Sequence, residues 1–88
     1  MKKVIQVQEV DGEGLEGMLG QRVFVMCTSY FYSGLLVGVN STFIKLDDCH
    51  IVYETGSWSD SKWMDAQKIG DAHYLMVAQI ESFRVDPR

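Results

Sequence analysis

The sequence predicts a small, mostly β protein in which a short N-terminal helix precedes five strands that curl into a barrel. Most of the chain consists of short runs of β-branched and aromatic residues separated by turn-forming residues, a pattern typical of strands. Gly34 and Gly38 lie inside the second run, where glycine favours the sharp bending that closes a sheet. The only proline is Pro87, so no proline interrupts any of the runs.

The expected elements follow one another in a simple order. Residues 14–20 place apolar side chains at helical spacing, and Gly20 suits the left-handed residue that ends a helix. Turns are expected at Thr28–Ser29 and Asn40–Ser41. The predicted strands are Arg22–Cys27, Tyr30–Val39, Phe43–Leu46 continued by Cys49–Tyr53, Tyr74–Ile80 and Ser82–Val85.

Residues 54–72 predict a long loop between the third and fourth strands, because they combine glycines and serines and lack strand periodicity. Long excursions in small domains are usually functional or interfacial. Trp58 and Trp63 are expected to hold this loop against its own barrel or against a neighbouring subunit. The alternative is that they form stacking platforms for single-stranded nucleic acid, although few lysines lie near them to make a basic groove.

Size and charge narrow the classes of function. The 88 residues are expected to form one domain, residues 1–88, and 47% of them are hydrophobic. A single domain of this length hides only about 60–65% of the surface of its unfolded chain, so we expect copies to cover one another. The formal net charge of -4 argues against general coating of nucleic acid, because phosphate neutralisation needs a basic surface.

Cysteine usage and hydropathy indicate the cellular compartment. Cys27 and Cys49 end apolar runs, form no motif and are expected to be reduced and buried. The first nine residues are too polar for a signal-peptide core, and no apolar run approaches the roughly 20 residues of a membrane span. We therefore expect a cytoplasmic protein with no membrane partner.

No combination of residues predicts a reaction or a bound metal. Cys27, Cys49, His50 and His73 carry suitable donor atoms, but their spacing matches no zinc motif. The aspartates are expected to be solvated turn residues, since no calcium-loop pattern is present. The sequence has neither a nucleophile elbow nor a phosphate-binding glycine loop. We expect no enzyme activity, no catalytic residue, no cofactor and no metal.

One motif resembles a known family. A spaced pattern of glycine, aliphatic and amide residues resembles the first motif of the Sm-like family, which includes LSm proteins and bacterial Hfq: Gly34, Leu36, Asn40, Ile44 and Leu46. Residues 77–82 stand at the place of the second motif, and the similarity covers about residues 15–85. The resemblance implies a strongly bent, five-stranded antiparallel barrel.

The resemblance also implies an assembly. In the family, the fourth strand of one subunit pairs with the fifth strand of the next and closes a ring of five to seven copies. Such pairing removes exposed strand edges, and closure limits growth. The ring-interface residues implied here are Tyr74, Met76, Ala78, Ile80, Phe83 and Val85.

RNA binding is the second implication. Family members bind a base in the loop after an acidic position, and the corresponding residues here are Asn40, Thr42 and Phe43, with Asn40 at the acidic position. Val77 and Ala78 stand where Hfq has lysine and histidine. Two functions stay open: a homo-oligomeric ring that binds RNA, and a structural or protein-binding ring with no role in nucleic-acid binding.

Overall fold

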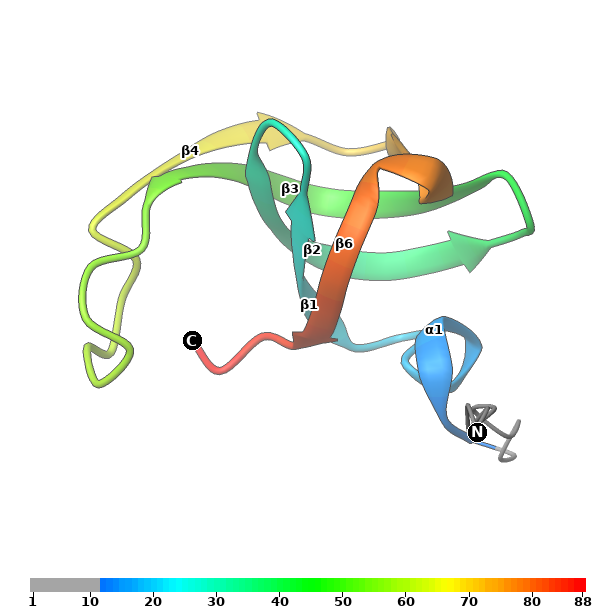
Figure 1. Cartoon of the computed structure of the whole chain (residues 1–88), viewed down its shortest axis with the longest axis horizontal. Coiled ribbons are helices and arrows are strands. Elements are labelled where there is room, and N and C mark those ends of the chain that lie inside the picture. Colours follow the sequence, from blue (N-terminus) through cyan, green and yellow to red (C-terminus); the bar gives the residue numbers. More distant parts are fainter. Residues whose placement is uncertain (1–11) are drawn as a thin grey trace, which may run out of the picture.

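The computed structural model describes residues 12–88, and six strands account for most of them (Figure 1). A one-turn helix precedes the strands, and a short 3-10 helix lies between the last two. The elements are α1 (Gly14–Gly17), β1 (Arg22–Cys27), β2 (Phe31–Val39), β3 (Phe43–Glu54), β4 (Asp65–Gly70), β5 (His73–Met76), η1 (Val77–Gln79) and β6 (Ile80–Val85).

All the strands pair in an antiparallel sense, in the order β4-β3-β2-β1-β6, and β5 also pairs with β3. The long β3 is divided between two partners: residues 43–46 pair with β5, and residues 49–54 pair with β4. Figure 1 shows β2 and β3 running side by side as curved ribbons, with β6 crossing in front of them. The mostly β fold with a bent antiparallel sheet is therefore confirmed.

The prediction of a loop over residues 54–72 was partly wrong, because residues 65–70 of this segment form the strand β4. Four of the six residues of β4 are exposed, and three of these four are polar, so the segment has no apolar alternation that could reveal a strand. It becomes a strand by pairing with the second part of β3, for example Ile51 with Gln67. The sheet consequently has six strands instead of the expected five.

The predicted strand Tyr74–Ile80 was also wrong in its second half. It ends at Met76, and the 3-10 helix η1 carries the chain across the barrel to β6. Two backbone hydrogen bonds hold this crossing: the Val77 N–H donates to the Thr42 carbonyl, and the Thr28 N–H donates to the Gln79 carbonyl, both at 2.9 Å. Because these partners are distant in sequence, local periodicity could not reveal the break.

The N-terminal helix is shorter than residues 14–20, since it ends at Gly17. Gly20 nevertheless adopts the expected left-handed conformation, with φ +86°. Leu15 and Met18 pack against the core, so α1 and the turn after it cover one side of the barrel.

The core lies inside the curved sheet. It is a cluster of buried side chains from β1, β2, β3 and β5: Val23, Val25, Cys27, Leu36, Ile44, Leu46, Cys49 and Leu75. Gly34 allows the bend around this core, because a Cβ there would lie 3.1 Å from the Leu46 Cβ and 3.2 Å from the Asp47 carbonyl oxygen. The β2–β3 register shifts beside it, between Ser33 and Leu35. No helix within residues 12–88 is long and apolar enough to cross a membrane.

Candidate functional site

Two strands at edges of the sheet, β5 and β6, carry exposed apolar side chains. We call β5 and β6 the end strands, although β4 also lies at an end of the strand order. Tyr74 and Met76 of β5 are 52% and 50% exposed, and Phe83 and Val85 of β6 are 37% and 44% exposed. Within residues 12–88, β5 pairs only with β3 and β6 pairs only with β1. Each of these strands therefore has one edge whose N–H and C=O groups no other strand covers.

The geometry of β6 explains why its side chains are exposed. Phe83 lies opposite Val25 and Val85 lies opposite Val23, and both of these β1 valines are fully buried. Residues directly opposite in an antiparallel pair share a face of the sheet, so Phe83 and Val85 extend the core face beyond its last covered strand. Ile80 is the one half-buried residue of β6, and it packs against the core of its own chain.

The six predicted interface residues therefore divide into two groups. Tyr74, Met76, Phe83 and Val85 lie on the end strands with exposed side chains. Ala78 is exposed but lies in η1, so its assignment to a strand was wrong. Ile80 begins β6, but its side chain belongs at least partly to the core.

Asn40 builds the turn between β2 and β3. Its side-chain oxygen accepts hydrogen bonds from the backbone N–H groups of Thr42 and Phe43, both at 2.8 Å, and its own N–H donates to the Phe43 carbonyl at 3.0 Å. This is the Asx-type arrangement in which a short polar side chain satisfies a tight turn. The oxygen of the Asn40 amide is thus committed to the backbone.

Phe43 meets the end strand β5. Its ring makes an edge-to-face contact with Tyr74 at 5.1 Å between centroids, and the Lys45 Nζ lies 5.9 Å from the centre of the Tyr74 ring. Met76 lies opposite Phe43 in the β3–β5 pair. The structure therefore joins a candidate RNA contact and two candidate interface residues in one surface, which we call the β5 patch: Phe43, Lys45, Tyr74 and Met76.

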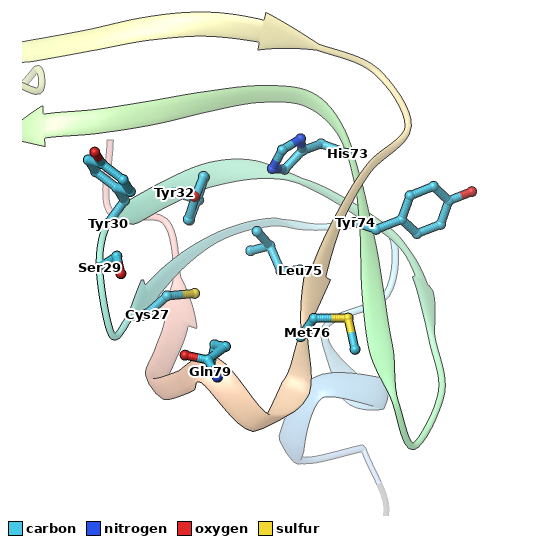
Figure 2. A pocket seen from close by; sticks show the side chains of 9 residues that line it. All are labelled: Cys27, Ser29, Tyr30, Tyr32, His73, Tyr74, Leu75, Met76 and Gln79. Carbon is cyan, nitrogen blue, oxygen red and sulfur yellow. The ribbon is translucent and has the colours of Figure 1, made fainter.

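A pocket beside β5 was missed by sequence reasoning. Its cavity has a volume of about 210 Å³ and lies between β5, η1 and the turn that joins β1 to β2 (Figure 2). The Tyr32 ring lies 5.5 Å from the His73 ring at its wall, and burial raises the pKa of Tyr32. The aromatic run at the start of β2 was the available signal, but only the fold brings it next to His73.

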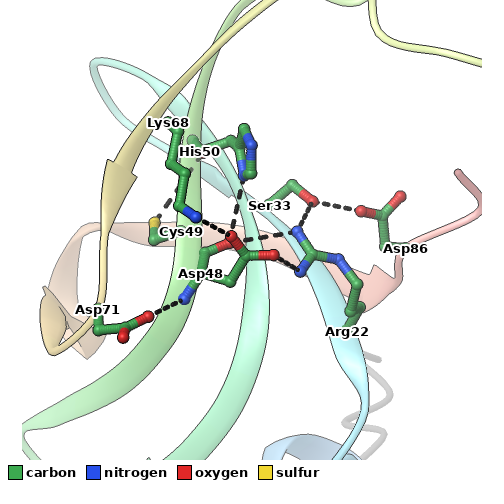
Figure 3. A network of polar contacts seen from close by, with 8 residues as sticks. All are labelled: Arg22, Ser33, Asp48, Cys49, His50, Lys68, Asp71 and Asp86. Atoms are coloured by element: carbon green, nitrogen blue, oxygen red, sulfur yellow. Dashed lines mark hydrogen bonds and ion pairs between the residues drawn. The ribbon is translucent and has the colours of Figure 1, made fainter.

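A polar network fastens the middle of β3, where Asp48 adopts φ +46° (Figure 3). The Asp48 carboxylate bridges Arg22 Nη1 at 2.9 Å and Lys68 Nζ at 3.2 Å. The hydrogen bond from Lys68, followed by the charges of Lys68 and Arg22, lowers the pKa of Asp48. The Asp48 N–H donates to Asp71 Oδ1 at 2.8 Å. The network therefore links β1, β3 and the β4–β5 junction.

Ser33 is the buried member of this network. Its hydroxyl donates to Asp86 and accepts a hydrogen bond from Arg22 Nη2 at 3.3 Å. The Ala72 N–H donates to Asp47 Oδ1 at 2.9 Å. The prediction that Asp47 and Asp48 are turn residues was wrong, because both lie within β3. Their side chains instead bind a backbone N–H group and neighbouring cations.

The candidate metal ligands do not assemble. Among residues 12–88, no group of three or more His, Cys, Asp or Glu side chains lies close enough to hold a metal ion. Cys27 and Cys49 are free and buried, and burial raises the pKa of both thiols, that of Cys49 to about 12. Burial therefore favours the protonated thiol, which is the weaker nucleophile, at both positions.

Trp58 and Trp63 hold the loop over residues 55–64 against its own barrel, as expected. The Trp63 ring stacks on the fully buried Phe24 with 4.4 Å between centroids. Trp58 contacts both rings edge to face, at 5.8 Å from Phe24 and 6.0 Å from Trp63. Sequence reasoning missed Phe24 as the support of the loop.

Comparison with known proteins shows the fold. The sequence matches no protein-family model and no curated protein. The structure is similar to a heptameric archaeal Sm protein, with a TM-score of 0.66, 15% identity, and coverage of 83% of this chain and 96% of that chain. It is also similar to a chain in the crystal structure of the NatC complex bound to CoA, with a TM-score of 0.61, 15% identity and 90% coverage of each chain. The fold is Sm-like.

Proposed function

We propose that this chain is an assembly subunit whose copies join edge to edge, the β5 edge of one copy pairing with the β6 edge of the next, in a closed ring of five to seven copies. The observation that carries the proposal is the pair of end strands in the Sm-like sheet. Within residues 12–88 each of them has an uncovered edge and exposed apolar side chains.

Pairing of β5 with β6 solves two problems at once. Uncovered strand edges invite uncontrolled pairing with other chains, and a specific partner strand removes that hazard. The same contact buries Tyr74 and Met76 on one copy and Phe83 and Val85 on the other, side chains that a single chain leaves in water. Because the two edges differ, the interface is head-to-tail and grows until a ring closes.

The archaeal Sm protein supports the ring, since it has this fold and is heptameric. The chain from the NatC complex supports a broader form of the same proposal, since there the fold is found within a complex. We place assembly before catalysis because the sequence carries none of the catalytic motifs considered above.

A ring with a protein-binding role is favoured over a ring that binds RNA. The Asn40 oxygen already accepts two backbone hydrogen bonds, so it is not free to read a base edge. The net charge of -4 opposes phosphate binding, and η1, at the place of the second motif, contains no basic residue. Phe43 and Lys45 of the β5 patch are the remaining candidates for an RNA contact.

Light scattering of the purified chain at micromolar concentration tests the assembly. We expect a mass of five to seven times the 10.0 kDa of one chain. Met76→Lys and Val85→Lys place a charge at each edge and should each abolish the ring. Met64→Lys is the matched control, because Met64 is exposed but lies outside the end strands. A wild-type chain with the mass of a monomer would contradict the proposal.

Fluorescence titration with oligo-U and oligo-A at two salt concentrations tests the role of RNA. The protein-binding ring predicts no saturable binding to either oligonucleotide. Tight binding that weakens with salt and that Phe43→Ala abolishes would establish the RNA-binding ring instead.

A further inference from the structure

The loop over residues 55–64 closes around the side chain of Arg88. The Nη1 atom donates hydrogen bonds to the carbonyls of Thr55 at 2.5 Å and Lys62 at 3.3 Å. The Nη2 atom donates to the Ser57 carbonyl at 2.8 Å. The centre of the guanidinium lies 3.9 Å from the Trp63 ring centroid and 5.3 Å from that of Trp58. We call this site the arginine cage: the two tryptophans and the carbonyls of Thr55, Ser57 and Lys62.

The cage is built from fixed parts. Trp63 stacks on Phe24, which is fully buried, so one aromatic wall is anchored in the barrel. Trp58 stands at 84° to Trp63 and forms a second wall. Asp60 fixes the turn that carries the carbonyls, because its carboxylate accepts the Ser57 N–H at 3.1 Å and its own N–H donates to the Ser57 carbonyl at 3.0 Å.

The chemistry of the cage matches a guanidinium and not an ammonium. A guanidinium is planar, so it can lie against an aromatic ring while its N–H groups point outward in its own plane. Here two terminal nitrogens reach three carbonyls that belong to different residues. Among residues 12–88, no carboxylate lies within ion-pair distance of Arg88, so recognition depends on shape and hydrogen-bond direction more than on charge pairing.

Within residues 12–88, Arg88 leaves one of its donors unsatisfied, and one wall of the cage is exposed. Its Nε atom is buried without a hydrogen-bond partner among the described residues, so the present occupant leaves one donor unsatisfied. Trp58 is 54% exposed, so the cage opens to solvent and not into the core. Only Asp86 and Pro87 connect Arg88 to the end of β6.

We propose that the arginine cage is a binding site for an arginine side chain on an extended segment of a partner protein. Arg88 fills the site within its own chain, and the partner's arginine takes its place when Arg88 withdraws. This proposal is independent of the ring, since none of the cage residues lies on β5 or β6.

The test uses the full chain carrying Arg88→Ala and a capped Asp-Pro-Arg tripeptide, the sequence of residues 86–88. Binding is followed by tryptophan fluorescence. We expect saturable binding, at least tenfold weaker binding of a capped Asp-Pro-Lys tripeptide, and loss of binding when Trp63→Ala is added. The wild-type chain should bind the arginine tripeptide at least tenfold more weakly than the Arg88→Ala chain, because a tethered occupant competes at an effective concentration in the millimolar range.

Three results would overturn the proposal: no binding to a folded Arg88→Ala chain, equal affinity for the arginine and lysine tripeptides, or equal affinity of the wild-type and Arg88→Ala chains. Amide spectra establish whether the variant is folded. If the Arg88→Ala variant is not folded, the proposal is tested on the wild-type chain. An excess of the arginine tripeptide should then shift the indole N–H resonances of Trp58 and Trp63, and the lysine tripeptide should not. Equal shifts, or none, would contradict the proposal.

Discussion

Two aromatic regions of this molecule are similarly exposed but differ in how many partners their rings have within the chain. Trp58 in the loop and Tyr74 on β5 are 54% and 52% exposed. Trp58 has partners on several sides within its own chain, namely Trp63, Phe24 and Arg88. Tyr74 contacts Phe43 and Lys45 and lies on a strand with an uncovered edge within residues 12–88.

The difference teaches that an exposed aromatic ring does not by itself mark an interface. In the loop, the Trp63 ring stacks on Phe24, and the Arg88 guanidinium lies over both tryptophan rings. Within residues 12–88, the end strands combine exposed apolar side chains with backbone groups that lack a strand partner, and this combination is the basis of the proposed assembly. The predictions below disturb each region in turn, beginning with the largest effect.

Phe24→Ala should remove the support of the loop over residues 55–64. Truncating a fully buried phenylalanine costs about 3–5 kcal/mol of the free energy of unfolding, and here it also removes the ring on which Trp63 stacks. Urea denaturation measures the loss, and tryptophan emission should move to longer wavelength in the folded variant. Phe24→Leu, which keeps an apolar side chain, should lose clearly less. A loss for Phe24→Ala below about 1 kcal/mol would show that the loop does not depend on this contact.

Asn40→Ala should weaken the turn that places Phe43 beside β5. Two backbone N–H groups lose their side-chain acceptor, and because the turn is exposed, water replaces part of the bond. We expect a loss of about 1 kcal/mol in the free energy of unfolding, measured by urea denaturation. Asn40→Asp keeps the acceptor oxygen and serves as the control. Equal stability of all three proteins would show that the Asn40 side chain is not needed for the turn.

Lowering the pH should weaken the network around Asp48, which links β3 to β1 and β4. The pKa of Asp48 in the folded protein is lowered from its usual 3.8, mainly by the hydrogen bond from Lys68. Its contribution to stability is therefore fully present above pH 3.8 and is lost as the pH falls through the lower folded value. Urea midpoints measured from pH 5 to pH 2.5 should fall less steeply in Asp48→Asn than in the wild type. Parallel curves would contradict this assignment.

The parts of the fold that sequence could predict are those with local apolar patterns. The strand β1 and the bend at Gly34 follow from such patterns. Tyr74 and Phe83, whose side chains are exposed, were named as interface residues only because of the family resemblance. The strand β4 has mostly exposed residues and exists because β3 offers it a partner, so no local pattern marks it. Pairing with β3, and not local sequence preference, makes this segment a strand.

The candidate sites divide in the same way. Asn40 was assigned correctly as a turn residue because the signal lies within four positions. The meeting of Phe43 with Tyr74, and that of Arg88 with Trp63, joins residues far apart in the chain. Nothing near Arg88 in the sequence indicates a cage 25 or more positions earlier, and only the folded sheet brings the two segments together.

A mixing experiment tests the central claim most directly, because each edge variant keeps the edge that the other has lost. Met76→Lys damages the β5 edge and leaves β6 intact, whereas Val85→Lys does the reverse. Light scattering should give a monomer mass for each variant alone and twice that mass for an equimolar mixture, since one intact β5–β6 contact can form per pair of chains. A mixture that stays monomeric, or a single variant that keeps the mass of the wild-type ring, would contradict the account.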